Sequence, residues 1–318
     1  MKISPNVKRL IDSDRPWLTD GGFETSMVFL EGIDLPAFSS SVLLESEKTR
    51  KAASDYFDRF LGLAAEAGTG FVLDTASWRA GAHWAGDVGR TEAQMLELAR
   101  ESVRFAKTYR DANQTETLPI IVNGVIGPAG DGYSPDTLLG PGLARSLHLP
   151  QIRAMADEGV EMISGVTITY PDEAIGIVQA SVSVGLPCVI SFTVETDGRL
   201  PTGQSLPDAI AEVDAATDAA PLWYMVNCAH PDHFADKLAG DWLDRIGGVR
   251  ANASRLSHAE LDMAEELDDG DPEEFGALHA SFATDLPALK VIGGCCGTDD
   301  RHVGCAARHV LKHHAHAA

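Results

Sequence analysis

The chain has 318 residues, 44% of them hydrophobic and 23% charged, an ordinary globular composition with enough apolar material for a large core. The formal net charge of −22 excludes nucleic acid as an expected partner, because binding phosphates requires a basic face. No apolar run approaches the length of a membrane span, and the N-terminal segment lacks the apolar centre of a signal peptide. Five cysteines, an odd number, do not resemble a secreted disulfide framework, so we expect a reduced, cytoplasmic protein that contacts no membrane.

Eight short apolar runs have the character of buried strands, and amphipathic stretches separate them. The expected strands are Trp17–Gly22, Phe71–Thr75, Pro119–Val125, Glu161–Thr169, Pro187–Thr193, Leu222–Cys228, Ile246–Ala251 and Leu289–Gly294. The expected helices are Leu44–Ala67, Glu92–Tyr109, Gln151–Glu158, Asp172–Val184, Pro207–Ala215, Ala259–Glu266 and His302–His313. This alternation predicts a parallel sheet, and eight units predict a closed (β/α)8 TIM barrel, an α/β fold, as a single domain over residues 1–318. A doubly wound open sheet is the alternative.

Polar and glycine-rich segments follow the expected strands, at the edge where barrel enzymes carry their active sites. Ordinary turn chemistry would account for any one of these segments, but their joint placement favours a site. The candidate residues are Asp20, Gly21, Gly22 and Glu24 at the end of the first strand, Thr169 at the end of the fourth, Glu195 at the end of the fifth, Asn227 and Cys228 at the end of the sixth, and Cys295 and Cys296 at the end of the eighth.

Three of the five cysteines form the most distinctive pattern. Cys228 ends one apolar run, and the adjacent Cys295 and Cys296 end another, inside Gly-Gly-Cys-Cys-Gly-Thr. Glycines beside the pair permit the sharp bend that lets neighbouring thiols face one point. Three thiolates suit a zinc ion with one open position, which implies chemistry, because structural zinc sites are usually closed by four protein ligands. The alternatives are buried apolar cysteines, the role expected of Cys188 and Cys305, or a redox disulfide.

The turn Asp20-Gly21-Gly22 suits the head group of an amino acid. Glycine lets backbone N–H groups approach a carboxylate, and the Asp20 side chain suits an ammonium. Beside a thiolate zinc site, this turn suggests a substrate that carries a thiol as well. Zinc-bound thiols lose their proton near neutral pH, and a site with three thiolates favours alkyl transfer to sulfur over hydrolysis.

Over nearly its whole length the chain resembles the homocysteine S-methyltransferase family, which includes betaine–homocysteine and S-methylmethionine–homocysteine methyltransferases. The resemblance rests on the segments 19–22, 190–193, 226–229 and 293–298. It implies a (β/α)8 barrel in which Cys228, Cys295 and Cys296 hold zinc and the sulfur of homocysteine takes the open position. It also places Asp20, Gly21 and Gly22 near the head group of the substrate and Asn227 beside the metal.

The chain departs from the family pattern after the second, fourth and seventh expected strands, and the loop after the seventh lacks the Tyr-Pro-Asn-like stretch of several family members. The family carries a glutamate after the fourth strand that helps to bind the ammonium of homocysteine, whereas this chain reads Thr-Ile-Thr-Tyr-Pro over 167–171. Glu195 at the next strand end is a candidate substitute. After the second strand, Trp78 and Trp84 bracket Arg79 and His83, either as ordinary packing or as an aromatic cage for a cationic methyl donor.

The sequence therefore predicts a zinc-dependent S-methyltransferase that moves a methyl group from an onium donor to a small-molecule thiol, with homocysteine the preferred acceptor and methionine the product. The same chemistry on another thiol or a selenol is one alternative. A zinc-binding or redox module without methyl transfer is the other. A homo-oligomer is compatible with the sequence.

Overall fold

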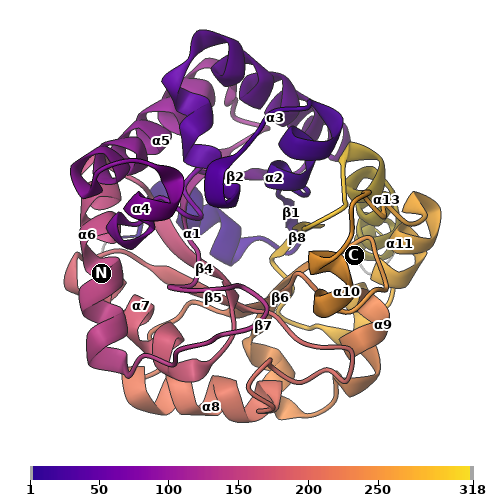
Figure 1. Ribbon diagram of the computed structural model, residues 1–318. Coiled ribbons are helices and arrows are strands. Elements are labelled where there is room, and N and C mark those ends of the chain that lie inside the picture. Colours follow the sequence, from indigo (N-terminus) through magenta and orange to yellow (C-terminus); the bar gives the residue numbers. More distant parts are fainter. Residues whose placement is uncertain (1–2, 316–318) are drawn as a thin grey trace.

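The eight strands lie in chain order around a closed barrel of parallel strands, and helices surround it (Figure 1). The computed structural model describes residues 3–315. Its strands are β1 (Trp17–Leu18), β2 (Phe71–Asp74), β3 (Ile120–Ile126), β4 (Met162–Ile168), β5 (Cys188–Phe192), β6 (Tyr224–Asn227), β7 (Ile246–Ala251) and β8 (Val291–Gly294). Leu18 pairs with Phe71 on one side and with Ile292 on the other, so the first and last strands join. The predicted barrel is confirmed, and the open sheet is excluded because it would leave two unpaired edges.

Helices connect successive strands on the outside of the barrel. The longer ones are α1 (Pro5–Asp12), α3 (Glu47–Ala67), α5 (Glu92–Asn113), α6 (Pro141–Asp157), α7 (Pro171–Ser183), α8 (Leu206–Thr217), α11 (Pro272–His279) and α13 (Asp300–Ala315). The short ones are α2 (Phe23–Thr25), α4 (Ala85–Val88), α9 (Pro231–Phe234), α10 (His258–Asp262) and α12 (Phe282–Asp285). Within residues 3–315, none of these helices has both the length and the apolar character needed to cross a membrane.

The helix predictions were wrong at several points, which include the unpredicted α1 and the end of α5, four residues beyond the predicted Tyr109. Helix α6 begins at Pro141 instead of Gln151 and continues through Pro150, a residue that usually marks a helix boundary because it lacks the N–H donor. Helix α10 ends at Asp262, four residues before the predicted end at Glu266. Helix α11 was not predicted. It begins after Asp271, whose side chain accepts hydrogen bonds from the N–H groups of two residues in the first turn.

Helix ends follow local sequence signals. Ser46 caps α3 by accepting a hydrogen bond from the Thr49 N–H, and Gly68 ends the same helix with a positive φ of 62°. At the start of α13, Asp299 Oδ2 accepts a hydrogen bond from Arg301 Nε at 2.8 Å, and Asp299 Oδ1 lies 2.9 Å from His302 Nδ1. These contacts outweigh the effect of burial and hold the pKa of Asp299 below its usual range.

The core has two parts because successive residues of a strand face opposite sides of the sheet. Outward-facing residues pack against the helices in one large cluster, for example Leu73 and Ile190. Inward-facing residues such as Val72 and Val189 fill the amino-terminal half of the barrel. Val7 and Leu10 of α1 join this inner cluster, and α1 lies behind the barrel in Figure 1. The barrel is therefore filled at one end, and open space remains at the carboxyl ends of the strands.

Candidate active site

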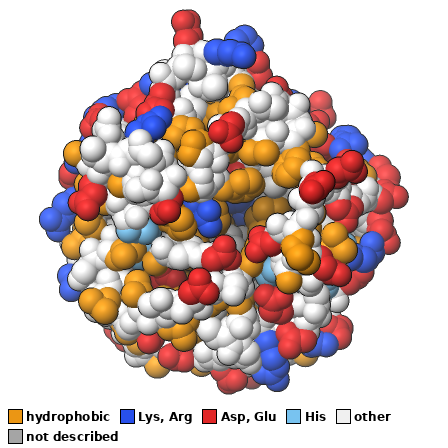
Figure 2. Space-filling view, in the orientation of Figure 1, with side chains coloured by type: hydrophobic (Ala, Val, Ile, Leu, Met, Phe, Trp, Pro, Cys, Tyr) orange, Lys and Arg blue, Asp and Glu red, His pale blue; other side chains and the backbone are white. Residues whose placement is uncertain are grey.

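A cavity of about 440 Å³ lies at the carboxyl ends of the strands. Figure 2 shows this face of the molecule, where hydrophobic side chains gather around a hollow near the centre and acidic side chains lie over much of the surrounding surface. The cavity is lined by residues of the carboxyl-terminal part of β4 and by residues that follow β1, β2, β3, β6, β7 and β8, including all three cysteines of the predicted zinc site. The cavity therefore lies at the carboxyl ends of the strands, where the sequence predicted the active site.

The thiols of Cys228, Cys295 and Cys296 converge at the inner end of this cavity. Their sulfur atoms all lie within 4.8 Å of one another, and Cys228 Sγ is 3.5 Å from Cys296 Sγ. A tetrahedral zinc site with bonds of 2.3 Å needs sulfur separations of about 3.8 Å, so the donor set fits zinc with small adjustments. Among residues 3–311, whose side chains the structure describes, this is the one cluster of three or more metal-ligating side chains.

Backbone geometry brings these thiols together. Cys228 has a left-handed backbone with φ of 55°, which is rare for a residue other than glycine and turns its side chain away from the strand direction. Gly297 has a φ of 78° and redirects the chain after the adjacent pair. A Cβ atom at Gly294 would collide with the Thr298 side chain, and one at Gly293 would lie 2.7 Å from Asp20 O. The glycines therefore permit both the predicted bend and close contact with the segment after β1.

Tyr133, in the loop between β3 and α6, was not predicted as part of the site. Its hydroxyl lies 3.2 Å from Cys228 Sγ and 3.6 Å from Cys296 Sγ. Burial and the neighbouring cysteine sulfurs raise the pKa of Tyr133 well above its usual value, so it is a neutral hydrogen-bonding group. The surrounding sequence is a loop rich in glycine and proline and has no motif that would have identified this tyrosine.

His258 contacts both Tyr133 and the backbone of Cys228. The ring of His258 stacks on Tyr133 with centroids 4.0 Å apart, and its Nε2 lies 2.8 Å from the carbonyl oxygen of Cys228. Its Nδ1 lies 2.9 Å from Glu195 Oε1. Among the described residues that line the cavity, neither Glu195 nor Thr169 is present. Glu195 is placed to orient His258, and its predicted role at the substrate ammonium stays a prediction.

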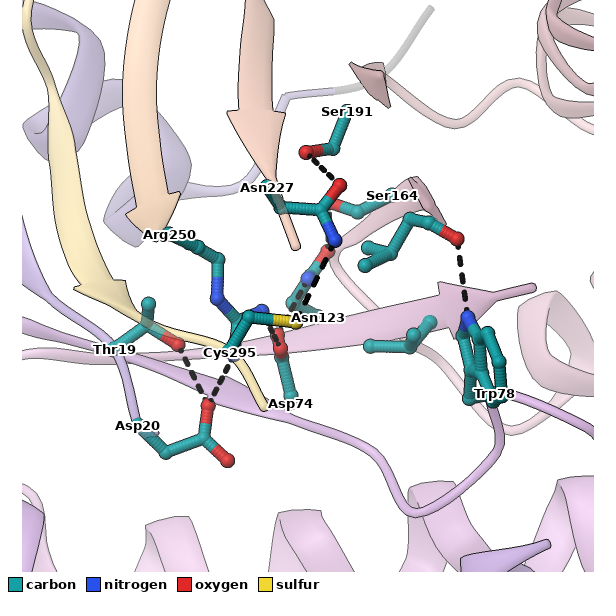
Figure 3. Close-up of polar contacts among 12 residues, drawn as sticks. Thr19, Asp20, Asp74, Trp78, Asn123, Ser164, Ser191, Asn227, Arg250 and Cys295 are labelled. Atoms are coloured by element: carbon teal, nitrogen blue, oxygen red, sulfur yellow. Dashed lines mark hydrogen bonds and ion pairs between the residues drawn. The ribbon is translucent and has the colours of Figure 1, made fainter. Parts of the chain in front are cut away.

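Arg250, at the end of β7, organises the acidic residues beneath the cavity (Figure 3). Its guanidinium donates to Asp20 Oδ1 at 2.6 Å, forms an ion pair with Asp74, and donates to the carbonyl oxygen of Gly294 at 3.3 Å. Asn123 Nδ2 donates to the other oxygen of Asp74 at 2.7 Å. Burial raises the pKa of Asp20 to about 7 against the lowering effect of Arg250, with further raising by Asp74. Arg250 was not predicted as a site residue.

The turn after β1 makes most of its hydrogen bonds within the protein. The Gly21 N–H donates to the Tyr56 hydroxyl at 3.1 Å, and the Gly22 N–H donates to the carbonyl oxygen of Thr298 at 2.9 Å. Asp20 is 2% exposed and also accepts from Tyr56 at 3.3 Å, so its carboxylate is already satisfied. The turn lines the cavity, but its predicted contacts with a substrate head group stay predictions.

Glu24 is the carboxylate near this turn that remains available to a ligand. It lines the cavity, and Oε1 accepts from the Ser40 hydroxyl at 2.7 Å, while Oε2 has no hydrogen-bond donor among the described residues. Burial raises the pKa of Glu24, which makes a cationic partner favourable for its charged form.

Asn227 connects the metal-ligand cluster to β4. Its Nδ2 lies 3.6 Å from Cys295 Sγ and donates to Thr167 Oγ1 at 2.8 Å, while its Oδ1 accepts from the Thr167 N–H at 3.0 Å (Figure 3 shows Asn227 beside Cys295). Thr167 has a left-handed φ of 63°, and the β4–β5 register shifts between Gly165 and Ile168. The two amide contacts hold this unfavourable backbone in place, at the segment where the family glutamate is missing.

The proposed aromatic cage after β2 is not available to a ligand. The guanidinium carbon of Arg79 lies 4.7 Å from the ring centre of Trp78 and 4.2 Å from that of Trp84, so Arg79 occupies the space between the two indoles. Trp78 Nε1 also donates to the carbonyl oxygen of Val166 at 3.0 Å. The interpretation of Trp78 and Trp84 as a cage for a cationic donor was wrong, because the guanidinium of Arg79 already occupies the space between their rings.

A (β/α)8 barrel with three converging cysteine thiols at its carboxyl end defines a barrel enzyme with a candidate thiolate metal centre. A family model described as homocysteine S-methyltransferase matches residues 17–310, so the chain belongs to the homocysteine S-methyltransferase family and is an S-methyltransferase.

Solved structures of one relative agree in fold. The crystal structure of the homocysteine methyltransferase MmuM from Escherichia coli in its oxidized form is 21% identical, covers 96% of this chain and 99% of that chain, and has a TM-score of 0.71. The metallated form is 20% identical over 95% and 99% of the two chains, with a TM-score of 0.70. At this identity the likeness demonstrates the common barrel.

Proposed function

We propose that the protein transfers a methyl group from an onium donor to the thiol of homocysteine, at zinc held by Cys228, Cys295 and Cys296. Family membership supports the reaction class. The observation that carries the metal assignment is the convergence of three sulfur atoms within 4.8 Å at the inner end of an open cavity. Zinc, when bound there, would lower the pKa of a thiol that takes its remaining position, so that the sulfur is a thiolate at neutral pH.

The protein groups around the sulfurs orient the acceptor. The Tyr133 hydroxyl lies 3.2 Å from Cys228 Sγ and borders the space that an incoming thiol would enter. In the transfer itself, a lone pair of the acceptor sulfur forms the new bond to the methyl carbon. The donor's bond to that carbon breaks, and its electron pair stays on the neutral leaving group. The role of the chain is to hold the two substrates in line.

Glu24 supports the assignment of an amino acid as acceptor. Its carboxylate lines the same cavity as the thiols and has one oxygen without a protein donor, which suits a substrate ammonium. Asp20 is committed to Arg250 and acts as a brace beneath the site. Glu24 is therefore the proposed partner of the substrate ammonium, the role that the sequence suggested for Asp20. Its carboxylate would also compensate for the glutamate that the family carries after β4 and that this chain lacks.

The charge of the cavity supports a cationic donor. Seven acidic residues line it, against two arginines, and the thiolates add to the negative charge. The acidic residues are Asp20, Glu24, Asp74, Asp131, Asp262, Glu266 and Asp268. A sulfonium or quaternary ammonium donor would be attracted to this field, and it becomes neutral when it gives up its methyl group, which favours product release.

The test is incubation of zinc-loaded protein with homocysteine and a set of sulfonium and quaternary ammonium donors, read by mass spectrometry. Methionine formation supports the proposal. A simple thiol or a selenol methylated in preference to homocysteine would contradict the acceptor assignment. A protein that binds no zinc and instead forms a reversible disulfide between the adjacent Cys295 and Cys296 would support the redox alternative.

A further inference from the structure

Arg79 is held rigidly at the wall of the cavity. It follows β2, lines the cavity, and lies between the rings of Trp78 and Trp84 at 4.7 and 4.2 Å. Its Nη1 donates to the carbonyl oxygen of Ala37 at 2.8 Å, and its own carbonyl oxygen accepts from the Ser39 hydroxyl at 3.0 Å. A guanidinium clamped on both faces loses little further freedom when it binds a ligand.

The remaining donors of Arg79 have no protein partner. Nε is buried without a hydrogen bond, Nη2 makes none within residues 3–315, and no carboxylate there lies within ion-pair distance of the guanidinium. This is unusual in a chain with 47 acidic residues and 25 basic ones. Burial lowers the pKa of Arg79, but an arginine remains charged at neutral pH. A charged, partly buried donor without an acceptor is a candidate site for an anion.

The other arginine of the cavity differs in this respect. Arg250 is saturated by Asp20, Asp74 and the carbonyl oxygen of Gly294. The N–H groups of Gly21 and Gly22 are also satisfied within the protein. An anionic group of a substrate in this acidic cavity therefore has Arg79 as its strongest available partner.

The position of Arg79 indicates which substrate it meets. Strands β2 and β6 are four positions apart in a ring of eight, so Arg79 after β2 lies across the barrel from Cys228 after β6. The acceptor sulfur must reach the cysteines, and the donor must approach that sulfur from the side away from them. The wall opposite Cys228 therefore borders the donor.

We propose that Arg79 binds the carboxylate of the methyl donor and thereby selects zwitterionic onium compounds, with a cationic methyl-bearing centre and a carboxylate, over purely cationic ones. This inference rests on the proposed function. The cationic centre faces the acidic residues and the thiolates, and the carboxylate accepts a charge-assisted hydrogen bond from Nη2 of Arg79, the donor that is neither buried nor bonded to the protein. Arg79 is a specificity residue, and no proton or methyl group passes through it.

Two matched pairs of probes test the assignment in the zinc-loaded protein. Glycine betaine and choline differ in a carboxylate against an alcohol, as do dimethylsulfoniopropionate and dimethyl(hydroxypropyl)sulfonium. Binding by calorimetry in the presence of homocysteine should favour the carboxylate member of the better-bound pair. Arg79→Gln should reduce that preference about 10- to 100-fold, the range for a lost charge-assisted hydrogen bond, and leave the alcohol member unchanged. Arg79→Lys should restore part of the preference.

Three controls separate this role from a structural one. Zinc content and the melting temperature of Arg79→Gln should remain close to wild type, and Arg308→Gln, an exposed arginine on α13 paired with Glu273, should behave as wild type throughout. Equal weakening of both members of a pair would show that Arg79 only braces the two tryptophans, and the proposal would be overturned. If Arg79→Gln weakened the binding of homocysteine more than the binding of its decarboxylated analogue, Arg79 would bind the carboxylate of the acceptor, and the proposal would be overturned. Because binding is measured without turnover, failure of methyl transfer would count against the proposed function alone.

Discussion

Arg250, at the end of β7, donates a 2.6 Å hydrogen bond to Asp20, which follows β1, although β8 lies between these two strands. The same guanidinium pairs with Asp74 at the end of β2. One side chain therefore ties together four neighbouring strands at the seam where the barrel closes. It also places a positive charge beneath the thiols. Hydrogen bonds from the other two cysteines lower the pKa of Cys295 despite burial, and the charge of Arg250 adds a smaller lowering effect.

Replacement of Arg250 should destabilise the fold. Arg250→Gln leaves Asp20 and Asp74 buried beside each other without a cation, which costs about 3–5 kcal/mol for a broken buried pair. Urea unfolding monitored by circular dichroism measures this change. The same substitution at the exposed Arg308 should alter stability by less than about 0.5 kcal/mol. A small effect at Arg250 would show that the carboxylates are protonated in the folded protein.

Each of the three clustered cysteines should be necessary for metal binding. Cys228→Ala, Cys295→Ala and Cys296→Ala each leave two thiolates, so zinc content after dialysis should fall from about one per chain to a small fraction. Cys188→Ala and Cys305→Ala serve as controls, because those two side chains pack in the barrel wall and on α13. Full zinc content in the Cys296 variant would remove that residue from the ligand set.

Glu24 and Asp20 should differ in their effect on acceptor selectivity. Glu24→Gln should raise the KM for homocysteine about 10-fold more than the KM for a thiol of similar length without an amino group, because it removes the free carboxylate. Asp20→Asn should affect both thiols to the same extent, since Asp20 contacts Arg250 and Tyr56. If steady-state kinetics instead showed that Asp20→Asn raises the KM for homocysteine selectively and Glu24→Gln does not, the substrate ammonium would be assigned to Asp20.

Glu195 should contribute through His258. Glu195→Gln keeps the size of the side chain but removes the charge that faces His258 Nδ1 at 2.9 Å. We expect a loss in kcat of roughly 10-fold or less, with KM for homocysteine and zinc content unchanged, because a positioning group of this kind contributes about 1 kcal/mol. A sharp rise in KM for homocysteine would instead support direct contact with the substrate.

The lowered pKa of Asp299 should make the free energy of unfolding depend on pH. Its folded pKa is below the usual value, so its charged form stabilises the protein at neutral pH, and this contribution is lost as pH falls below about 4. Asp299→Asn should therefore cost about 1–2 kcal/mol at pH 7, the range for a helix cap with charged partners, and progressively less in acid. Denaturant unfolding at both pH values measures the difference. An effect that does not change with pH would contradict the assignment.

The sequence allowed the barrel and the thiol cluster to be predicted because both follow from local patterns. Alternating apolar runs and helices set the topology, and Gly-Gly-Cys-Cys-Gly combines the ligands with the glycines that position them. Tyr133, His258 and Arg250 were missed as site residues because their roles depend on contacts between distant loops and strands. Arg79 was visible between its tryptophans, but only the three-dimensional contacts show that it occupies the space between them.

The origin of the thiols in β6 and β8 sets an order of events during synthesis. Cys228 is made well before Cys295 and Cys296, and the last two reach it only when β8 has paired with both β7 and β1. Such distant contacts form late, because the entropy of closing the intervening chain has to be overcome first. At the proposed zinc site, binding by all three thiols would therefore follow ring closure, and a nascent chain without β8 would present only one of the three, that of Cys228.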